Sequence, residues 1–270
     1  MKTSAQADNR FQQDVDKYAA YLATPEGRLR LDLAFANLEE FLPPRHANSS
    51  LRALDLGCGT GAVAVRLAKL GFHVTLLDAS STMLDVAERA AAEARVSANI
   101  ALQHGDAAEA ASLFPSESFD LILCHNLLEL EYVDDPGLVL CGAARLMRGS
   151  SAILSILVRN QAGEVFKAAI QAGDLAAAKD GLTAEWGQES LYGGTVRLFT
   201  LDNLRNMLKA ASFQAIAERG VRIIVDYLPP QVSRSHEYER ILELERKLGS
   251  RAEFAAAARY IHFLARRAAP

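Results

Sequence analysis

The sequence predicts an α/β fold built on a mostly parallel, doubly wound, seven-stranded sheet, and three observations support this prediction. Between Leu51 and Val158, short apolar runs alternate with longer segments of helical periodicity. The apolar runs are continuous, as expected of parallel strands that helices cover on both faces. A glycine-rich turn at Gly57–Gly61 joins the first apolar run to the first helical segment. Right-handed crossovers would then place the helices on both faces of the sheet.

Two helices are predicted before the sheet, within an N-terminal segment of residues 1–50. Helical periodicity covers Phe11–Tyr21 and Pro25–Phe41. Thr24 is a helix-start signal, because a threonine side chain caps the first turn and the proline after it needs no amide partner there. Pro43 and the proline that follows it end the second helix.

The predicted core, residues 51–160, alternates strands with helices. Strands are expected at Leu51–Leu56, His73–Leu77, Asn99–Gln103, Phe119–Cys124 and Ala152–Val158, and helices at Thr60–Leu70, Ser81–Arg95, Ala107–Leu113 and Pro136–Met147. Parallel strands joined in this way end at one edge of the sheet, where ligands of such folds bind.

The alternation stops after residue 160. We expect an inserted helical cap over residues 161–199, and completion of the sheet by residues 200–270 of the same catalytic domain. Three aromatic residues of this region, Trp186, Tyr192 and Phe199, would suit a lid over an enclosed pocket, although such a cluster is more often local core. The last elements expected are helix Thr200–Ala211 with Thr200 as its cap, strand Ala215–Leu228, helix Arg234–Leu248 and strand Arg259–Arg266.

Composition excludes several classes of protein. The 270 residues are half hydrophobic and carry a net charge of −4, so a core is available and the chain as a whole is no electrostatic binder of nucleic acid. Basic residues outnumber acidic ones after Arg219, a weak sign of an anionic partner. Cys58, Cys124 and Cys141 show no metal-ligand spacing, and no leader or membrane span is recognisable. We therefore expect a cytoplasmic protein with no metal and no membrane partner.

The turn after the first strand carries the strongest functional signal. Gly57, Gly59 and Gly61 stand at alternate positions, which lets the backbone turn tightly and approach a bulky ligand. This G-x-G-x-G spacing differs from the G-x-G-x-x-G dinucleotide fingerprint. Asp55, before the first glycine, would disfavour a diphosphate but tolerate a cationic or zwitterionic ligand. A strand–helix turn that simply needs glycine is the alternative.

Acidic residues follow the second and third strands. Asp78 comes about 20 residues after the glycine turn, where a carboxylate can accept both ribose hydroxyls, and an NAD enzyme would use an acid there too. Met83 would offer an apolar face to adenine or simply join the core. Asp106 would reach an adenine amino group, cap the following helix, or do both.

His125 follows the fourth strand. A lone histidine at a strand end is usually only hydrogen-bonded structure. Because His125 is expected to lie beneath the cofactor, a structural role and a role in the chemistry are weighed equally.

These strand ends together resemble class I S-adenosylmethionine (SAM) methyltransferases. Asp55–Gly61 resembles their motif I, Asp78–Leu84 fits their pattern D-x-S-x-x-M-L, and the segment around His125 resembles motif IV. The resemblance implies a Rossmann-like fold that binds SAM rather than NAD.

A narrower resemblance extends from about Phe11 to Arg267. The motifs that carry it are Glu26–Arg30, His125–Glu129, Gly220–Arg222 with Asp226–Leu228, and Arg259–His262. They resemble the tRNA 5-carboxymethoxyuridine methyltransferase family, which uses SAM to esterify the carboxylate of a modified wobble uridine.

Carried over residue by residue, this resemblance divides the candidate site in two. On the cofactor side, Arg30 would pair with the SAM carboxylate, and Gly57 and Cys58 would contact the ligand from the glycine loop. Asp78 would hold the ribose, and Asp106 and Ala107 would contact the adenine end. His125 would lie at the methyl-donor region. The strand-end argument adds Asp55, Gly59 and Met83 to this cofactor set. On the substrate side, a role is inferred for Arg222, Tyr227, Arg259 and Tyr260.

The two substrate-side arginines have structural alternatives. An arginine near the site could bind a carboxylate or phosphate through two hydrogen bonds. Arg222, expected on a strand, could instead hold Asp226, and for Arg259 the structural and functional roles are weighed equally. A carboxylate acceptor is already ionised at neutral pH and needs positioning rather than a base. An amine or alcohol acceptor would need a base, for which His125 is available.

The expected cap departs from the family in one respect. Residues 178–186 lack the lysine cluster that the family carries there. Because phosphate contacts dominate affinity for RNA, tRNA would bind more weakly or through the basic C-terminal part. Two alternatives therefore stay open, namely methylation of a small molecule enclosed by the cap, and a SAM-binding protein without turnover.

Overall fold

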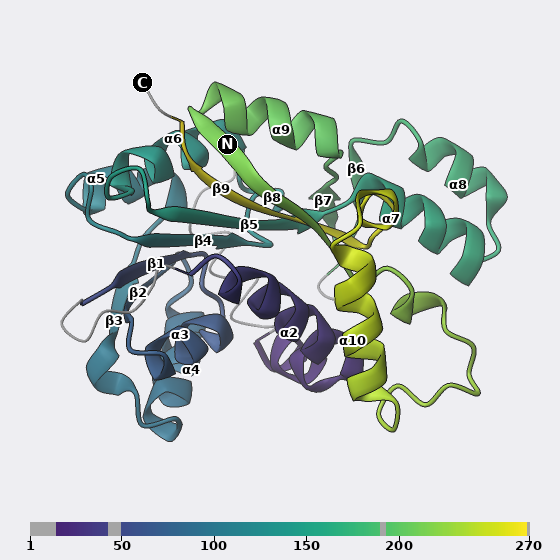
Figure 1. Ribbon diagram of the computed structural model, residues 1–270, viewed down its shortest axis with the longest axis horizontal. Coiled ribbons are helices and arrows are strands. Elements are labelled where there is room, and N and C mark those ends of the chain that lie inside the picture. Colours follow the sequence, from purple (N-terminus) through teal and green to yellow (C-terminus); the bar gives the residue numbers. More distant parts are fainter. Residues whose placement is uncertain (1–14, 43–49, 190–192, 269–270) are drawn as a thin grey trace.

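One mixed sheet organises the molecule. The computed structural model describes residues 15–42, 50–189 and 193–268. Its seven-stranded sheet has the order β3-β2-β1-β4-β5-β9-β8 (Figure 1). The strands are β1 (Arg52–Leu56), β2 (His73–Asp78), β3 (Ile100–His104), β4 (Leu121–His125), β5 (Ile153–Arg159), β8 (Phe213–Val221) and β9 (Tyr260–Arg267). The first five are parallel and β9 is antiparallel to both β5 and β8, which confirms the predicted fold class.

Helices cover both faces of this sheet. Below it in Figure 1 lie α2 (Pro25–Glu39), α3 (Ala62–Lys69) and α4 (Ser81–Glu93), and above it lie α5 (Ala110–Leu113), α6 (Pro136–Leu146) and α9 (Leu201–Ala210). Each face buries its own apolar cluster, one centred on Leu54 and Phe263 and the other on Leu67 and Leu121. Burial on both faces explains why the strands read as continuous apolar runs.

Side-chain caps begin the helices where the sequence predicted them. Thr24, Ser80 and Thr200 accept hydrogen bonds from backbone N–H groups in the first turns of α2, α4 and α9. Asp106 does the same for the short 3-10 helix at Ala107–Glu109. Residues 15–23 are also helical, whereas residues 11–14 and the two prolines after Leu42 lie outside the described residues.

One predicted strand is too long. The segment expected as strand Ala215–Leu228 leaves the sheet after Val221, because Arg222 adopts a left-handed conformation with φ of 63°. A 3-10 turn follows at Val225–Tyr227. It packs near α10 (Tyr238–Gly249), which leads through α11 (Ala252–Ala255) into β9. Arg222 therefore follows the strand rather than lying on it.

The region after β5 consists of short elements beside the sheet (Figure 1). They are α7 (Gln161–Phe166), the π-helix η3 (Lys167–Gln171), α8 (Leu175–Gly181), and the two-stranded ribbon of β6 (Trp186–Gln188) and β7 (Thr195–Arg197). Of the three aromatic residues suggested for a lid, Phe199 is fully buried in the core, as its alternative predicted, and Trp186 is 40% exposed beneath Arg197. The third, Tyr192, lies outside the described residues.

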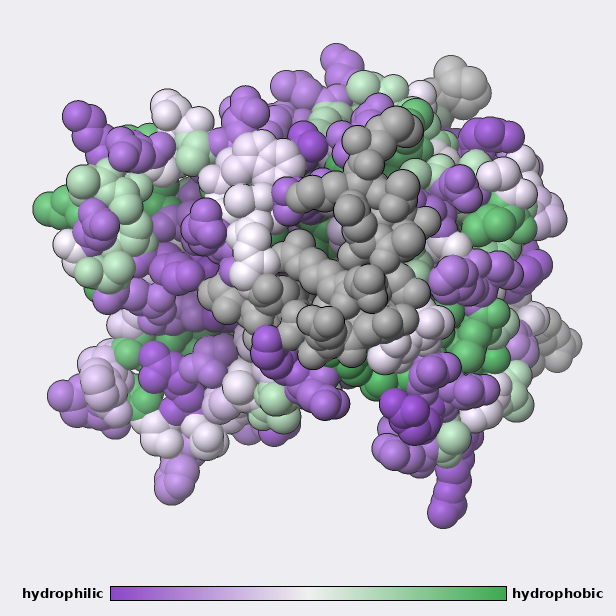
Figure 2. Space-filling view, turned by 180° about the vertical axis from the view of Figure 1, so that it is seen from behind, coloured by the Kyte–Doolittle hydropathy of each residue, from purple (hydrophilic) through white to green (hydrophobic). Residues whose placement is uncertain are grey.

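On the face in Figure 2, hydrophobic groups are separated by hydrophilic ones. Among the described residues, no helix is both long and apolar enough to span a bilayer.

Candidate active site

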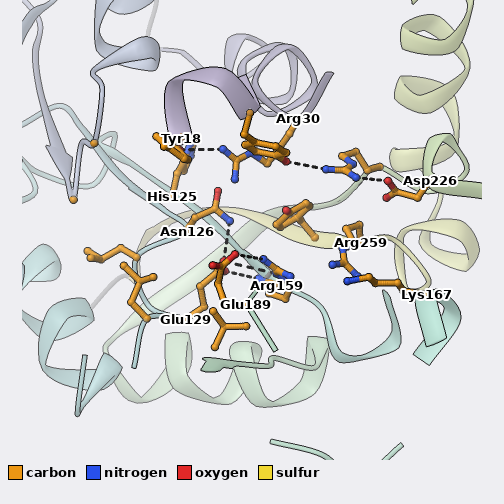
Figure 3. A pocket seen from close by; sticks show the side chains of 18 of the residues that line it. Tyr18, Arg30, His125, Asn126, Glu129, Arg159, Lys167, Glu189, Asp226 and Arg259 are labelled. Carbon is orange, nitrogen blue, oxygen red and sulfur yellow. Dashed lines mark hydrogen bonds and ion pairs between the residues drawn. The ribbon is translucent and has the colours of Figure 1, made fainter. Parts of the chain in front are cut away.

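A cavity of about 300 Å³ opens beside the carboxyl ends of the parallel strands, within the usual size range of ligand pockets. We call its two sides the glycine end, lined by Gly57, Gly59, Asp78 and Met83, and the arginine end, lined by Lys167, Arg222, Asp226, Tyr227 and Arg259. His125 and Tyr18 lie well apart from Arg259 and Lys167 in Figure 3. A long cavity of this kind can bring two different ligand groups together.

The glycine end is shaped by the backbone. Gly57 and Gly59 have φ angles of 64° and 53°, which side chains rarely tolerate. A Cβ atom on Gly57 would meet the Leu127 side chain at 2.8 Å. Both oxygens of Asp78 accept backbone hydrogen bonds, from the N–H of Gly59 at 2.8 Å and from that of Ser80 at 2.9 Å. Asp78 therefore fixes the loop and lines the cavity at the same time.

Asp55 and Cys58 line a smaller hollow of about 40 Å³ that shares Gly57, Arg30 and His125 with the main cavity. Asp55 is 5% exposed. Burial, together with the negative charge of Asp78, raises the pKa of Asp55 to about 8. A cationic group bound here would relieve both effects, as the ammonium group of an amino acid would.

Of the residues predicted to contact adenine, one lines the cavity and two do not. Met83 is buried and lines the cavity at the start of α4. Asp106 and Ala107 follow β3, and neither is among the residues lining the cavity. Their contact with the adenine end stays a prediction.

Arg30 is held over the cavity by tyrosines. It extends from α2, is 5% exposed and donates from Nη2 to the hydroxyl of Tyr18 at 3.0 Å. The rings of Tyr18, Tyr21 and Tyr260 lie within 6 Å of its guanidinium carbon. Among the described residues, the bond to Tyr18 is the one hydrogen bond of the Arg30 side chain, so a further anionic partner such as a carboxylate fits its remaining donors.

His125 is a neutral side chain at the end of β4. Burial and the charge of Arg30 lower the pKa of His125 to about 3. Its Nε2 atom lies 2.8 Å from the hydroxyl of Ser155. Such a histidine is a weak base at neutral pH, so it is poorly suited to deprotonate an amine or alcohol.

Beside the arginine end, four guanidinium groups and several acids surround the phenol of Tyr260. Burial alone would raise the pKa of Tyr260, but the surrounding arginines outweigh it and lower the pKa to about 8. The guanidinium groups concerned are those of Arg159, Arg30, Arg222 and Arg259. An anionic ligand would find a strongly positive field here.

Arg222 and Arg259 are each held by one acid. Arg222 donates to the Tyr21 hydroxyl at 2.9 Å and pairs with Asp226, as its structural alternative predicted. Arg259 pairs with Glu164 at 3.1 Å. Within the part of the chain that the structure describes, the Nη1 atom of Arg259 is buried without a hydrogen-bond partner. A buried guanidinium donor without an acceptor is energetically unfavourable. A ligand oxygen that accepts a hydrogen bond from this atom would therefore be strongly bound.

The structure brings further residues into the site that the sequence argument did not assign. Arg159 ends β5 and lies 3.0 Å from Glu164, and its backbone N–H donates to Glu129 at 2.6 Å. The strand-end rule applied to the fifth strand would have found Arg159. Lys167, on the π-helix, has no such signal, because only folding brings it to the cavity.

The geometry of the glycine end fits SAM. Positive-φ glycines leave room for a bulky ligand, Asp78 presents a carboxylate, and Asp55 has a pKa raised by burial that a cation would lower. Arg30 is available to the ligand's carboxylate. SAM carries these complementary groups.

Comparison with known proteins supports this assignment. The family described as a methyltransferase domain matches residues 47–216. The tRNA 5-carboxymethoxyuridine methyltransferase of Escherichia coli is 30% identical over 267 residues, covering 96% of this chain and 97% of that protein. The ubiquinone biosynthesis O-methyltransferase of Hahella chejuensis is 31% identical over 128 residues, 47% of this chain and 52% of its own.

Solved structures agree on the fold. The 1,6-didemethyltoxoflavin-N1-methyltransferase of Burkholderia thailandensis, solved with S-adenosylhomocysteine, aligns with a TM-score of 0.61 at 17% identity and covers 100% of this chain and 92% of its own. The [4+2]-cyclase SpnF aligns with a TM-score of 0.64 at 19% identity, covering 99% and 97%. At these identities the alignments show the fold alone. The matched family and the full-length relative together show that this chain belongs to the class I SAM-dependent methyltransferases.

Proposed function

We propose that this methyltransferase esterifies a carboxylate of a modified wobble uridine in tRNA. The observation that carries the proposal is the arginine end, where Arg259 lines a cavity that also reaches the glycine end and its buried Nη1 atom has no hydrogen-bond partner among the described residues. A carboxylate held there would be ionised and oriented without any base. The relative that matches the full length of the chain is named for an acceptor that carries such a carboxylate.

The chain's residues divide the work of this reaction. SAM supplies an electrophilic methyl group on a sulfonium. Arg259, together with Arg222, would hold the acceptor carboxylate so that one of its oxygens lies in line with the methyl group. His125 stays neutral because burial and Arg30 lower its pKa, so it takes no proton from the acceptor. The side chains of Arg222 and Arg259 are largely buried, which strengthens these charged contacts.

Recognition of tRNA would rest on fewer surface charges than in an ordinary RNA-binding protein. On α10, Arg240 and Lys247 are paired with neighbouring acids, at 3.0 and 2.6 Å. Such exposed pairs are weak and can exchange an acid for a phosphate. We therefore expect modest affinity for tRNA with a shallow salt dependence.

A small-molecule acceptor is the second candidate. It is favoured by the cavity itself, which is lined on its far side by the region after β5. The ubiquinone biosynthesis relatives, which match about half of this chain, are named O-methyltransferases. A phenolic acceptor of that kind would need a base, and neutral His125, with its low pKa, does not supply a strong one.

The two candidates are separated by a labelling experiment. The full-length protein is incubated with methyl-labelled SAM and, in parallel, with bulk tRNA that contains 5-carboxymethoxyuridine, with its nucleoside digest, and with small carboxylic acids and phenols. We expect label in tRNA that mild alkali releases as methanol, because methyl esters hydrolyse and N-methyl or ether groups do not. Arg259→Ala should lower this transfer about 100-fold, as the loss of a charged hydrogen-bond pair predicts.

Two controls test whether the loss of transfer in Arg259→Ala is specific to acceptor binding. Arg145→Ala removes an exposed arginine of α6 that has no part in the proposed recognition and should leave transfer unchanged. SAM binding by Arg259→Ala, measured by calorimetry, should also stay unchanged. Alkali-stable label, or label only in a small molecule, would overturn the tRNA ester proposal.

A further inference from the structure

A chain of buried hydrogen bonds connects His125 through β5 and β9 to the helix α2 that covers the same face of the sheet. The His125 Nε2 atom lies 2.8 Å from Ser155 Oγ, and Ser155 Oγ lies 2.8 Å from His262 Nε2. The side-chain nitrogen of Asn37 lies 3.3 Å from His262 Nδ1. The four residues come from β4, β5, β9 and α2 in turn. Ser155 and His262 are 0% exposed, and Asn37 is 5% exposed.

The chemistry of each group sets the direction of the protons. An amide nitrogen only donates, so Asn37 donates to His262 Nδ1. Burial, the neighbouring His125 ring and the charge of Arg219 lower the pKa of His262, which leaves it neutral. A neutral imidazole that accepts at Nδ1 carries its proton on Nε2. His262 therefore donates to Ser155, and the Ser155 hydroxyl is left to donate to His125.

The last step decides the state of His125. Its Nε2 atom accepts from Ser155, and because the ring is neutral its proton must lie on Nδ1. Among the described residues, Nδ1 of His125 forms no hydrogen bond, and the side chain lines the cavity. The N–H at this position can therefore reach a ligand.

We propose that Asn37, His262 and Ser155 are positioning residues that hold His125 as the Nδ1–H tautomer, so that it donates a hydrogen bond to the acceptor carboxylate. This assignment of the acceptor rests on the proposed function, whereas the tautomer does not. The donated bond would hold one carboxylate oxygen while the other faces the methyl group. Fixing the tautomer also removes His125 as a competing acceptor that would repel the anion.

The tautomer can be read directly in the full-length protein without any acceptor. The chain has six histidines, so nitrogen NMR of protein labelled with 15N-histidine is tractable, and signals are assigned by His125→Asn and His262→Gln. We expect a protonated Nδ1 in His125 and a protonated Nε2 in His262, with no change between pH 6 and 8. His236→Gln, at an exposed position, should leave both signals in place. A protonated Nε2 on His125, or a charged ring at pH 7, would overturn the proposal.

Variants test whether the chain matters for catalysis. Ser155→Ala frees the His125 Nε2 atom, so its tautomer should become mixed and kcat should fall about tenfold, the effect of one hydrogen bond, while KM for SAM stays the same. Ser155→Thr keeps the hydroxyl and should restore the single tautomer. Thermal unfolding of each variant separates this effect from a loss of folded protein.

Substitutions of His125 itself give a second readout. His125→Asn places an amide donor near the Nδ1 position, and His125→Gln places one near Nε2. We expect His125→Asn to retain more activity, and Ser155→Ala to have little further effect in the His125→Asn background, because the tautomer no longer needs fixing. Equal losses in both His125 variants, with full additivity, would contradict the positioning role. These kinetics use whichever acceptor is methylated, so failure of the tRNA proposal is distinguishable.

Discussion

The two ends of the cavity are built in different ways. At the glycine end, the loop after β1 and the loop after β2 are joined by backbone hydrogen bonds to Asp78. At the arginine end, Arg222 bonds to Tyr21, which is 201 residues away in the chain. The first end depends on local backbone geometry, and the second on side chains from distant segments. The glycine end can therefore be recognised from a sequence motif, whereas the arginine end is formed only when the chain has folded.

Of the substitutions that test this difference between the two ends, removal of Asp78 should have the largest effect on ligand binding. Asp78→Ala leaves two backbone N–H groups without their acceptor and removes the carboxylate expected to bind ribose, so SAM affinity should fall at least about 100-fold. Calorimetry measures the change. Asp85→Ala, an exposed acid on α4, is the control and should bind SAM normally. Unchanged SAM binding in Asp78→Ala would remove the glycine end from the cofactor site.

Glu245 offers a way to break the arginine end alone. This fully buried acid of α10 accepts the backbone N–H groups of Ile223, Ile224 and Val225 at 2.7 to 2.9 Å. Glu245→Ala should lower the free energy of unfolding by about 3 kcal/mol, because buried donors lose their partner. Transfer should fall while SAM binding persists at temperatures where the variant is folded. Urea unfolding measures the stability, and Glu239→Ala, at an exposed position, is the control. A loss of SAM binding in folded Glu245→Ala would show that the two ends of the cavity are not independent.

The pH dependence of SAM binding should sharpen the role of Asp55. Its pKa is raised to about 8, so below pH 8 the free protein carries a proton there that a bound cation displaces. Affinity should then rise with pH, approaching tenfold per unit, up to about pH 8, and fall above it as the ligand's amino group is deprotonated. Calorimetry in buffers of different ionisation enthalpy should show one proton released at pH 7. Asp55→Asn should abolish that release, and proton release that persists in the variant would exclude Asp55.

At the other end of the cavity, ionisation of Tyr260 should weaken binding of the acceptor as the pH rises, an effect smaller than that of Asp55 on SAM binding and of opposite sign. Arginine charges lower the pKa of Tyr260 to about 8, so above that pH a phenolate would compete with an anionic acceptor. KM for the acceptor should rise about threefold between pH 7.5 and 9, the scale of a partly screened charge contact. Tyr260→Phe should flatten this rise. Tyr227→Phe is the control, because burial and Asp226 raise the pKa of Tyr227 to about 12, and a flattened profile in that variant would reassign the effect.

Local sequence signals predicted most of the fold. Strands of the core and capped helix starts at Thr24, Ser80 and Thr200 agree with the structure, because caps and continuous apolar runs depend on neighbouring residues. The strand after Ala215 was predicted too long because apolar residues continue past Val221. The left-handed turn at Arg222 is stabilised by Glu245, more than twenty residues later, and no local pattern encodes that contact.

The sequence by itself determined the sheet, the glycine turn and the position of Asp78, since each follows from residues close together in the chain. Only the tertiary structure decided that Arg222 also bonds to Tyr21, that Arg259 keeps a buried donor with no partner among the described residues, and that Ser155 and His262 stand behind His125. These contacts join segments far apart in sequence, and their strength depends on burial that a linear pattern does not contain.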